Sequence, residues 1–322
     1  MTIRIKGTGS ALPERVLTNS ELEKMVDTSD EWIRERTGIR ERRISSGDTV
    51  ASLASAACMN ALESAGKTAE DVELILVATC SPELLLPCCA CQVQNTIGAQ
   101  NAVAFDLNAA CSGFLFALDT AYAYITAGIY KNALVVGSEV LSKLVDWNDR
   151  STCVLFGDGA GAVYVEGTKD EDSGIVSIVQ DSNGAKGMVL YCNDRSADCK
   201  VQEEACDTFI HMDGREVYKF ATRQVPECIE RALEKASLNV DDIDIFILHQ
   251  ANIRILEAIA KHLKADISRF PVNLDHVGNM SSAAIPVLLD ELNKNNKIKK
   301  GQRIVLSGFG AGLTSGACVM IW

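Results

Sequence analysis

Residues 103–114 read VAFDLNAACSGF. An apolar run ends at Leu107, a turn of small residues follows, and a new apolar pattern at helical spacing begins beside Cys111. This order predicts a strand, a tight turn and a helix, with Cys111 at the helix N-terminus. The positive end of a helix dipole favours a thiolate, so we expect Cys111 to have a lowered pKa and to act as a nucleophile. The alternative is a buried structural cysteine.

Outward from this segment, apolar runs alternate with helical patterns, which is typical of an α/β architecture. We expect strands at 3–7, 72–78, 103–107, 133–138, 161–165, 175–180, 243–248, 303–307 and 317–321. We expect helices at 19–26, 30–37, 49–65, 88–97, 112–127, 214–236, 253–263 and 281–293.

Short blocks of sequence recur 171 positions further along the chain. They pair ALESA at 61–65 with ALEKA at 232–236, DVEL at 71–74 with DIDI at 242–245, Asn108 with Asn279, and LVVG at 134–137 with VLSG at 305–308. Generic α/β patterning is the alternative, but a constant spacing favours a duplication. We therefore predict two similar halves, 1–166 and 167–322, related by a pseudo-dyad, with a site between them.

Two further residues are candidates for that site. His249 follows the apolar strand 243–248, and ligands bind at such strand ends in open α/β sheets. Asn279 is the counterpart of Asn108, so we expect it to face the same cavity as Cys111 and to donate a hydrogen bond to a developing oxyanion. A buried core histidine and a helix N-cap are the alternatives. Glycine-rich turns at 156–161 and 308–312 lack the phosphate-binding fingerprints, but can present backbone N–H groups.

Composition excludes several classes of protein. The formal charge of −12 argues against a partner made of nucleic acid or an anionic membrane, except at a local basic patch. The uncharged stretch 87–105 is too polar to span a membrane. The first residues, MTIRIK, lack the apolar core of a signal peptide, so we expect the twelve cysteines to be reduced thiols in the cytoplasm. No second CxxC pair exists in the chain to join the cluster of Cys88, Cys89 and Cys91 in a zinc site, and we predict no metal.

Taken together, several motifs resemble β-ketoacyl-acyl-carrier-protein synthase III, which initiates bacterial type II fatty acid synthesis. They are TSDEWIRERTGIRERR at 28–43, AACSGF around Cys111, FGDGAGAV at 156–163, HQAN at 249–252, GNMSSAAIP at 278–286 and GFGAGLT at 308–314. The resemblance runs in order along nearly the whole chain. It implies the thiolase-like fold, layered αβαβα, and a homodimer.

The resemblance also implies a mechanism. Cys111 would take an acyl group from acyl-CoA, and malonyl-acyl carrier protein would then enter, lose carbon dioxide and attack the acyl-cysteine. His249 and Asn279 would stabilise the enolate, and the backbone N–H groups of Cys111 and Ala311 would form an oxyanion hole. The CoA-binding residues would be Trp32, Arg36, Arg150 and Asn252. The acyl pocket would be shaped by Leu141, Phe156 and, from the partner subunit, Leu86. No cofactor is implied beyond the thioester substrates.

A carrier protein is acidic in this family, so an acidic enzyme needs a basic dock. Arg254 and Lys261 lie seven positions apart and share a helical face, and Lys219 and Arg223 lie four apart on another expected helix. We predict that these four residues dock the carrier, although a solvated helix face is the alternative.

Some positions depart from the family pattern: Met280, where threonine is common, Ser315, where tryptophan is frequent, and Cys88 and Cys89. They leave open the starter acyl group, whether acetyl, longer straight or branched. The rival functions are another thiolase-fold enzyme, a related acyltransferase or condensing enzyme of secondary metabolism with a different donor or acceptor, and a non-catalytic carrier-binding scaffold. The presence of Cys111, His249 and Asn279 together favours the condensing enzyme.

Overall fold

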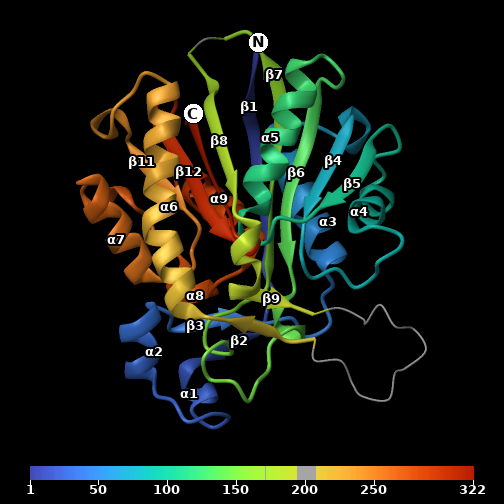
Figure 1. Cartoon of the computed structure of the whole chain (residues 1–322). Helices are drawn as coiled ribbons and strands as arrows, with labels where there is room; N and C mark the ends of the chain where they lie inside the picture. The colour runs from blue at the N-terminus through green and yellow to red at the C-terminus, as the bar shows by residue number, and fades with distance from the viewer. Residues whose placement is uncertain (171, 194–207) are drawn as a thin grey trace.

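The computed structural model describes residues 1–170, 172–193 and 208–322. Two sheets lie face to face with helices between them and on both outer sides (Figure 1). The first sheet has the order β1 (Thr2–Ala11), β7 (Gly159–Thr168), β6 (Asn132–Glu139), β4 (Leu74–Ala78) and β5 (Val103–Leu107). The second has the order β8 (Gly174–Ser182), β13 (Thr314–Ile321), β12 (Arg303–Gly310) and β11 (Ile245–Leu248).

Strand directions repeat between the two sheets. In the first, β1 and β7 and then β7 and β6 are antiparallel, whereas β6 and β4 are parallel. In the second, β8 and β13 and then β13 and β12 are antiparallel, whereas β12 and β11 are parallel. Only β5 lacks a counterpart within the described residues. The predicted duplication is confirmed at the level of topology.

The layers follow from which helix faces are apolar. Helices α5 (Gly113–Thr126) and α9 (Ala284–Lys294) lie between the sheets, and Phe114, Leu118, Leu288 and Leu289 are buried there in one cluster with strand residues from both sheets. Helices α3 (Val50–Ala65) and α4 (Cys89–Ile97) cover the outer face of the first sheet. Helices α6 (Gly214–Lys235) and α7 (Ile253–Leu263) cover the outer face of the second. The predicted αβαβα layering is confirmed.

The N-terminal segment packs on the second half of the molecule. It contains β2 (Val16–Thr18), α1 (Asn19–Leu22), α2 (Asp30–Thr37) and β3 (Glu41–Arg43), and its apolar residues join the cluster under the second sheet. Arg42, fully buried, donates to the carbonyls of Leu17 and Val154 and to Asn19 Oδ1, because a buried guanidinium needs partners for its N–H groups. The division of the chain at residue 166 stays a prediction.

Several boundaries differ from those expected. The helix at 19–26 is only the four-residue α1. The helices expected from 112 and 281 begin later, after the 3₁₀ turns η2 (Ala110–Ser112) and η7 (Ser281–Ala283). The strands expected from 72 and 243 likewise follow η1 (Ala69–Asp71) and η5 (Val240–Asp242).

The remaining elements are short. They are β9 (Leu190–Cys192), β10 (Ile210–Met212), α8 (Leu274–Val277), η3 (Leu141–Lys143), η4 (Gly184–Val189) and η6 (Ile267–Arg269). Across the described ranges, no helix has the length and apolar character needed to cross a membrane.

Candidate active site

Cys111 lies in the turn that joins β5 to α5. Ala110 has a φ of 46°, in the left-handed region, and its N–H donates to Asn108 Oδ1 over 3.1 Å. Gly310, at the end of β12, approaches the turn so closely that a Cβ atom there would lie 2.7 Å from the backbone nitrogen of Cys111. Only glycine allows this contact, which brings the 310–312 turn of the second half against the nucleophile.

Asn279 lies in the equivalent turn of the second half. Ser281 has a φ of 47°, and its N–H donates to Asn279 Oδ1 over 2.9 Å, as Ala110 does to Asn108. The backbone of Asn279 is fixed on both sides, because its N–H donates to Leu155 and its carbonyl accepts from Gly157. Since Oδ1 already accepts a hydrogen bond, the Nδ2 group of Asn279 is left to donate to a ligand.

His249 follows β11, where its N–H donates to the carbonyl of Ser307 over 2.8 Å. The ring is buried and meets the edge of Phe309 at 5.5 Å between centroids. Burial lowers the pKa of His249 to about 3, so the imidazole is neutral over the working range of pH. Among the described residues, Nδ1 has no hydrogen-bond partner. A neutral imidazole can still donate one hydrogen bond to a substrate oxygen.

A cavity of about 270 Å³ opens onto Cys111. Four of the predicted site residues line it together: Cys111, Leu141, Phe156 and Ala311. His249 and Asn279 are buried and do not line it. Leu86 is 86% exposed and lies outside the cavity of its own chain.

The protonation state expected for Cys111 is wrong for the unliganded cavity. Burial raises the pKa of its thiol to about 12, and the nearby Ser281 hydroxyl offsets only part of this rise. The prediction rested on the helix N-terminus and did not weigh the removal of the thiolate from water, which is the larger effect here. A nucleophilic role for Cys111 therefore requires that its thiol lose a proton in the course of the reaction.

The four predicted CoA-binding residues lie in one surface cluster. The guanidinium of Arg150 lies 4.7 Å from the ring centroid of Trp32, and that of Arg36 lies 5.9 Å from it. Asn252 caps α7 and donates from Nδ2 to the carbonyl of Arg36 over 3.0 Å. An indole face beside two guanidinium groups suits an aromatic base and phosphates.

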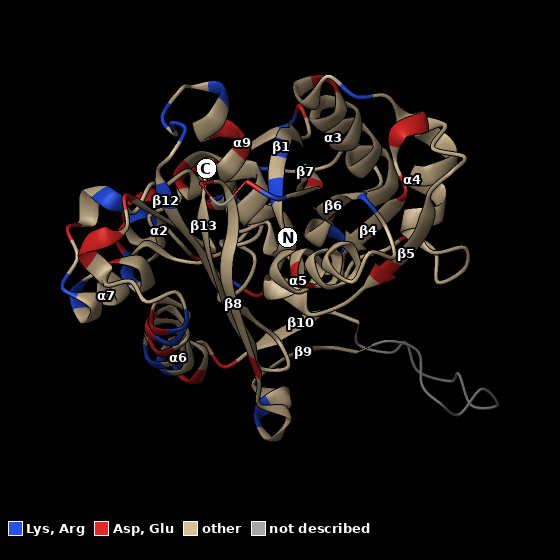
Figure 2. Ribbon diagram, turned by 90° about the horizontal axis from the view of Figure 1, so that it is seen from above, with Lys and Arg blue, Asp and Glu red and all other residues tan. Residues whose placement is uncertain are grey.

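The predicted docking residues differ in their surroundings. Helices α6 and α7 lie side by side, and α6 mixes cations with acids (Figure 2). On α6, Lys219 pairs with Glu216 at 2.6 Å and Arg223 with Glu227 at 3.0 Å. On α7, Arg254 and Lys261 are exposed, and neither forms an ion pair within the described ranges. Of the four predicted docking residues, the two without an ion pair among the described residues are thus on α7.

The residues that depart from the family pattern do not line the cavity beside Cys111. Met280 is buried with Val277 and Val287, away from the cavity. Ser315 is buried on β13, where its hydroxyl lies 3.3 Å from the Cys228 sulfur. Cys88 and Cys89 begin α4 and are likewise absent from the cavity lining.

Several lining residues were missed. Leu190, Tyr191, Cys192 and Ile210 come from the β9–β10 hairpin. Three-residue strands carry too short a pattern to be recognised. Ser281 was visible beside Asn279 in the sequence, and the duplication could have pointed to it as the counterpart of Ala110. In the described part of the chain, no group of three or more His, Cys, Asp or Glu side chains could hold a metal ion.

Comparisons with known proteins agree with this arrangement. The family description "3-Oxoacyl-[acyl-carrier-protein (ACP)] synthase III" matches residues 105–184, and its C-terminal counterpart matches residues 233–322. A β-ketoacyl-[acyl-carrier-protein] synthase III of Clostridium acetobutylicum is 47% identical over 100% of this chain and 99% of its own length.

Two solved structures are similar to the chain over nearly all of both molecules. The 3-oxoacyl-[acyl-carrier-protein] synthase III of Aquifex aeolicus has a TM-score of 0.93 and 43% identity, covering 99% of this chain and 100% of its own. The priming β-ketosynthase of the R1128 polyketide biosynthetic pathway has a TM-score of 0.94 and 34% identity, covering 99% and 96%. The chain belongs to the β-ketoacyl-acyl-carrier-protein synthase III family of condensing acyltransferases.

Proposed function

We propose that this enzyme catalyses the initiating condensation of type II fatty acid synthesis, with Cys111 as its nucleophile. The observation that carries the proposal is the pairing of two equivalent turns, one from each half. One presents a buried thiol and the other presents a buried amide with a free donor, and the 310–312 turn adds backbone beside the thiol. A thiol facing preorganised neutral donors suits acyl transfer through a thioester.

In the first step, the Cys111 sulfur attacks the carbonyl carbon of acyl-CoA. The backbone N–H groups of Cys111 and Ala311 stabilise the tetrahedral oxyanion, the carbon–sulfur bond to CoA breaks, and CoA leaves as its thiol with the proton that Cys111 gives up. Trp32 and Arg150 hold the adenine, and Arg36 and Asn252 contact the phosphates and pantetheine. The acyl chain lies between Leu141 and Phe156 in the 270 Å³ cavity.

In the second step, malonyl-acyl carrier protein occupies the vacated channel. His249 and Asn279 donate hydrogen bonds to the thioester carbonyl of the malonyl group. Carbon dioxide leaves, and the resulting enolate attacks the carbonyl carbon of the acyl-cysteine, which returns the Cys111 thiolate and yields a 3-oxoacyl product. Since His249 is neutral, it stabilises the enolate as a hydrogen-bond donor and not as a cation.

The carrier protein docks on α7 through Arg254 and Lys261, with Lys219 of α6 at the edge of the surface. Reversing the charge in Arg254→Glu should lower the use of malonyl-acyl carrier protein and leave the acylation of Cys111 by acyl-CoA unchanged. Glu257→Gln, which alters a neighbouring exposed acid on α7, is the matched control. An equal loss in both half-reactions of Arg254→Glu would contradict the docking role.

The assembly that completes the acyl pocket is a homodimer. Edge strand β5 has no partner on its outer side, and Leu84, Leu85 and Leu86 are exposed beside α4. Leu86 of the partner subunit would close the cavity that the chain's own Leu86 does not reach. The enzyme works in the cytoplasm, in keeping with the thiols of Cys58, Cys111 and Cys318, which form no disulfide within the described residues, and needs no cofactor beyond its thioester substrates.

The direct test follows carbon dioxide and the condensed product together. Wild type should release both in equal amounts from acyl-CoA and malonyl-acyl carrier protein. Cys111→Ala should lose condensation, whereas Asn279→Ala should acylate normally and fail to release carbon dioxide. Full condensation by Cys111→Ala would refute the assignment.

A second function is favoured by the likeness to the priming β-ketosynthase of a polyketide pathway. In that case the same half-reactions would run with a different acyl donor or carrier. Comparing a fatty acid carrier with a polyketide carrier at equal concentration separates the two, because the physiological acceptor should give the higher kcat/KM.

A further inference from the structure

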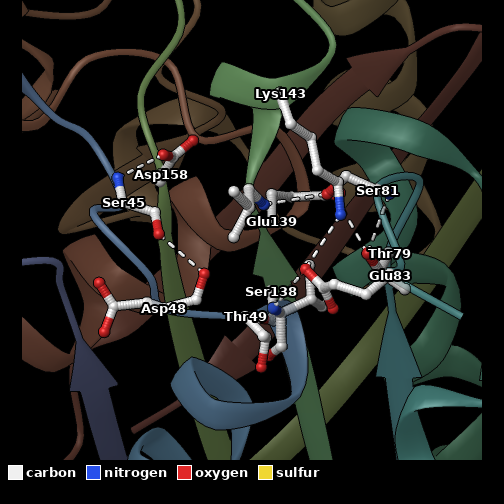
Figure 3. Close-up of polar contacts among 12 residues, drawn as sticks. Ser45, Asp48, Thr49, Thr79, Ser81, Glu83, Ser138, Glu139, Lys143 and Asp158 are labelled. Carbon is white, nitrogen blue, oxygen red and sulfur yellow. Dashed lines mark hydrogen bonds and ion pairs between the residues drawn. The ribbon is translucent and has the colours of Figure 1, made fainter.

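Glu139, at the end of β6, is a fully buried carboxyl group that the proposed mechanism does not use. Its Oε2 atom accepts from the Ser81 hydroxyl at 2.5 Å, the Cys80 N–H at 3.1 Å and the Thr79 hydroxyl at 3.2 Å (Figure 3). Both hydroxyl oxygens already accept backbone N–H groups, from Val140 and Ser81 respectively, so their own protons point to Glu139.

The other carboxyl oxygen, Oε1, lies next to the hydroxyl of Ser282, and this hydroxyl has a second possible acceptor for its one proton. Ser282 Oγ lies 2.8 Å from Oε1 and 2.9 Å from the carbonyl oxygen of Ala78. A hydroxyl has one proton, and a carbonyl oxygen can only accept. Both contacts are satisfied in full if Ser282 donates to Ala78 and Glu139 itself carries a proton that it donates to Ser282.

A second buried acid shows the opposite pattern. Asp158 accepts from the N–H groups of Ser45 and Ser142 and from the Ser142 hydroxyl, at 2.6 to 2.9 Å. Every described partner of Asp158 is a donor, as an ionised carboxylate requires, and the contact with Ser45 is drawn in Figure 3. Both acids are buried, so they differ in the kind of hydrogen-bond partner around each carboxyl group and not in exposure.

The surroundings of Glu139 agree with a neutral acid. Burial raises its pKa, as it also raises that of Asp158, and no Lys, Arg or His in the described ranges forms an ion pair with Glu139. The titratable groups that face it are the thiols of Cys80, 3.5 Å away, and Cys111. An ionised Glu139 would therefore be an uncompensated charge beside the nucleophile, which is costly at a buried site.

We propose that Glu139 is a positioning residue that works as a neutral carboxylic acid, joining the end of β4 and β6 in the first half to the η7 turn of the second. The chain of donors runs from Glu139 through Ser282 to Ala78 and crosses the boundary between the halves. It holds the adjacent Ser281 in its left-handed conformation, with its hydroxyl close to Cys111. It also keeps negative charge away from the thiol that must lose a proton.

Infrared difference spectroscopy on the intact enzyme tests the protonation state without any substrate. The spectrum of wild type minus Glu139→Gln at neutral pH should contain the carbonyl band of a protonated carboxylic acid. Asp158→Asn, the matched control, should remove carboxylate bands only. If Glu139→Gln removes only carboxylate bands, the proposal is overturned. Should that variant fail to fold, Ser282→Ala should shift the acid band by removing its acceptor, and the lack of any shift would overturn the proposal.

A chemical measurement tests the effect on Cys111. The rate of alkylation of Cys111 by iodoacetamide below the thiol pKa reports the thiolate fraction. Since Glu139 is neutral, Glu139→Gln should leave that rate within about twofold of wild type at each pH. If Glu139 were ionised, removing its charge would raise the rate at every pH by about tenfold or more, and that result would refute the proposal.

Kinetics separate positioning from a purely structural role. Glu139→Ala should lower kcat for condensation with little change in the KM for acyl-CoA, and Glu139→Gln should rescue kcat because an amide offers the same donor and acceptor positions. Equal kcat values for the folded fractions of the two variants would contradict positioning. The infrared and alkylation results do not depend on the proposed function, so the two hypotheses can fail separately.

Discussion

At the reacting residues, burial decides which protonation states are present. It holds Cys111 as a thiol and His249 as a neutral imidazole, because both charged forms lose hydration in the cavity. Two neutral groups cannot form the thiolate–imidazolium pair that many cysteine enzymes use. The mechanism that we propose instead relies on donors that are already in place, namely Asn279 Nδ2, the His249 ring and the backbone around Gly310.

The neutral state of His249 makes a prediction about pH. His249→Ala should lower decarboxylation by about 10²–10³-fold, whereas His249→Gln, which can still donate, should lose less. The pKa of His249 is about 3, so this residue stays neutral above pH 4. Protonation of His249 should therefore cause no loss of condensation activity above that pH. Rates of carbon dioxide release from pH 5 to 9 measure this. An acidic limb near the usual histidine value of 6.5 that disappears in His249→Gln would contradict it.

At the scale of elements, α8 and α9 hold the Asn279 turn between them through an ionic contact. His276 Nδ1 lies 3.0 Å from Asp275 and Nε2 lies 3.6 Å from Glu291 on α9. Glu291 in turn accepts from Asn273 at 3.1 Å, at the start of the same loop. Glu291, and then Asp275, raise the pKa of His276 to about 9, and the same contact lowers that of Glu291.

These shifts define a pH window for stability. Because His276 binds its proton more tightly in the folded state, its stabilisation is complete below 6.5 and is lost as pH rises through about 9. Because the pKa of Glu291 is lowered, the stabilisation contributed by its carboxylate is lost as pH falls below the usual carboxyl pKa of 4.5. The His276 side chain is 42% exposed, so solvent screening reduces the effect.

His276→Gln should therefore lower the free energy of unfolding at pH 7 by about 0.5–1 kcal/mol. Urea unfolding at pH 7 and pH 10 measures this, with His262→Gln, a change at an exposed histidine of α7, as the control. The difference between His276→Gln and wild type should be nearly gone at pH 10. A difference of the same size at both pH values would show that packing, and not the charge, is responsible.

At the scale of the whole molecule, the two halves meet through positions that have room for no side chain. A Cβ atom on Gly137 of β6 would lie 2.2 Å from the carbonyl oxygen of Ser282 in η7. In the second sheet, a Cβ atom on Gly310 of β12 would lie 2.7 Å from the backbone nitrogen of Cys111 in the first half. The pseudo-dyad thus brings each sheet close to a catalytic segment of the other half.

Gly137→Ala tests this close approach. The methyl group would meet backbone and not a flexible side chain, so the halves must separate, and the free energy of unfolding should fall by about 3 kcal/mol or more. Gly184→Ala, with open space around its Cβ position, should change it by less than about 0.5 kcal/mol. Thermal unfolding with an assay of condensation measures both. A stable and fully active Gly137→Ala would show that the interface between the halves can adapt.

Much of this arrangement could be predicted because the duplication leaves regular traces. Strong patterns placed β4, β6, β11 and β12, and the constant spacing placed Asn279 in the turn equivalent to that of Asn108 and Cys111, although Asn279 does not line the cavity. The ends of helices were harder to predict from the sequence. The η2 and η7 turns depend on the left-handed residues Ala110 and Ser281, and neither is a glycine, the residue that usually marks this conformation.

Other features depend on contacts between distant segments, which local patterns do not record. The packing of residues 17–39 on the second half, the cavity wall from β9 and β10, and the raised pKa of Cys111 are of this kind. The partners of Glu139 come from two separate segments, 79–81 and the η7 turn at Ser282, and nothing in SEVL at 138–141 points to them.

The most direct measurement is the intact mass of the enzyme after exposure to a panel of acyl-CoAs, followed by addition of malonyl-acyl carrier protein. One acyl group should add to wild type, map to Cys111 by peptide sequencing, and disappear on addition of the carrier as 3-oxoacyl product forms. Cys111→Ala should gain no mass. An acyl group on another residue, or an adduct that malonyl-acyl carrier protein leaves in place, would contradict a condensing enzyme with Cys111 as its nucleophile.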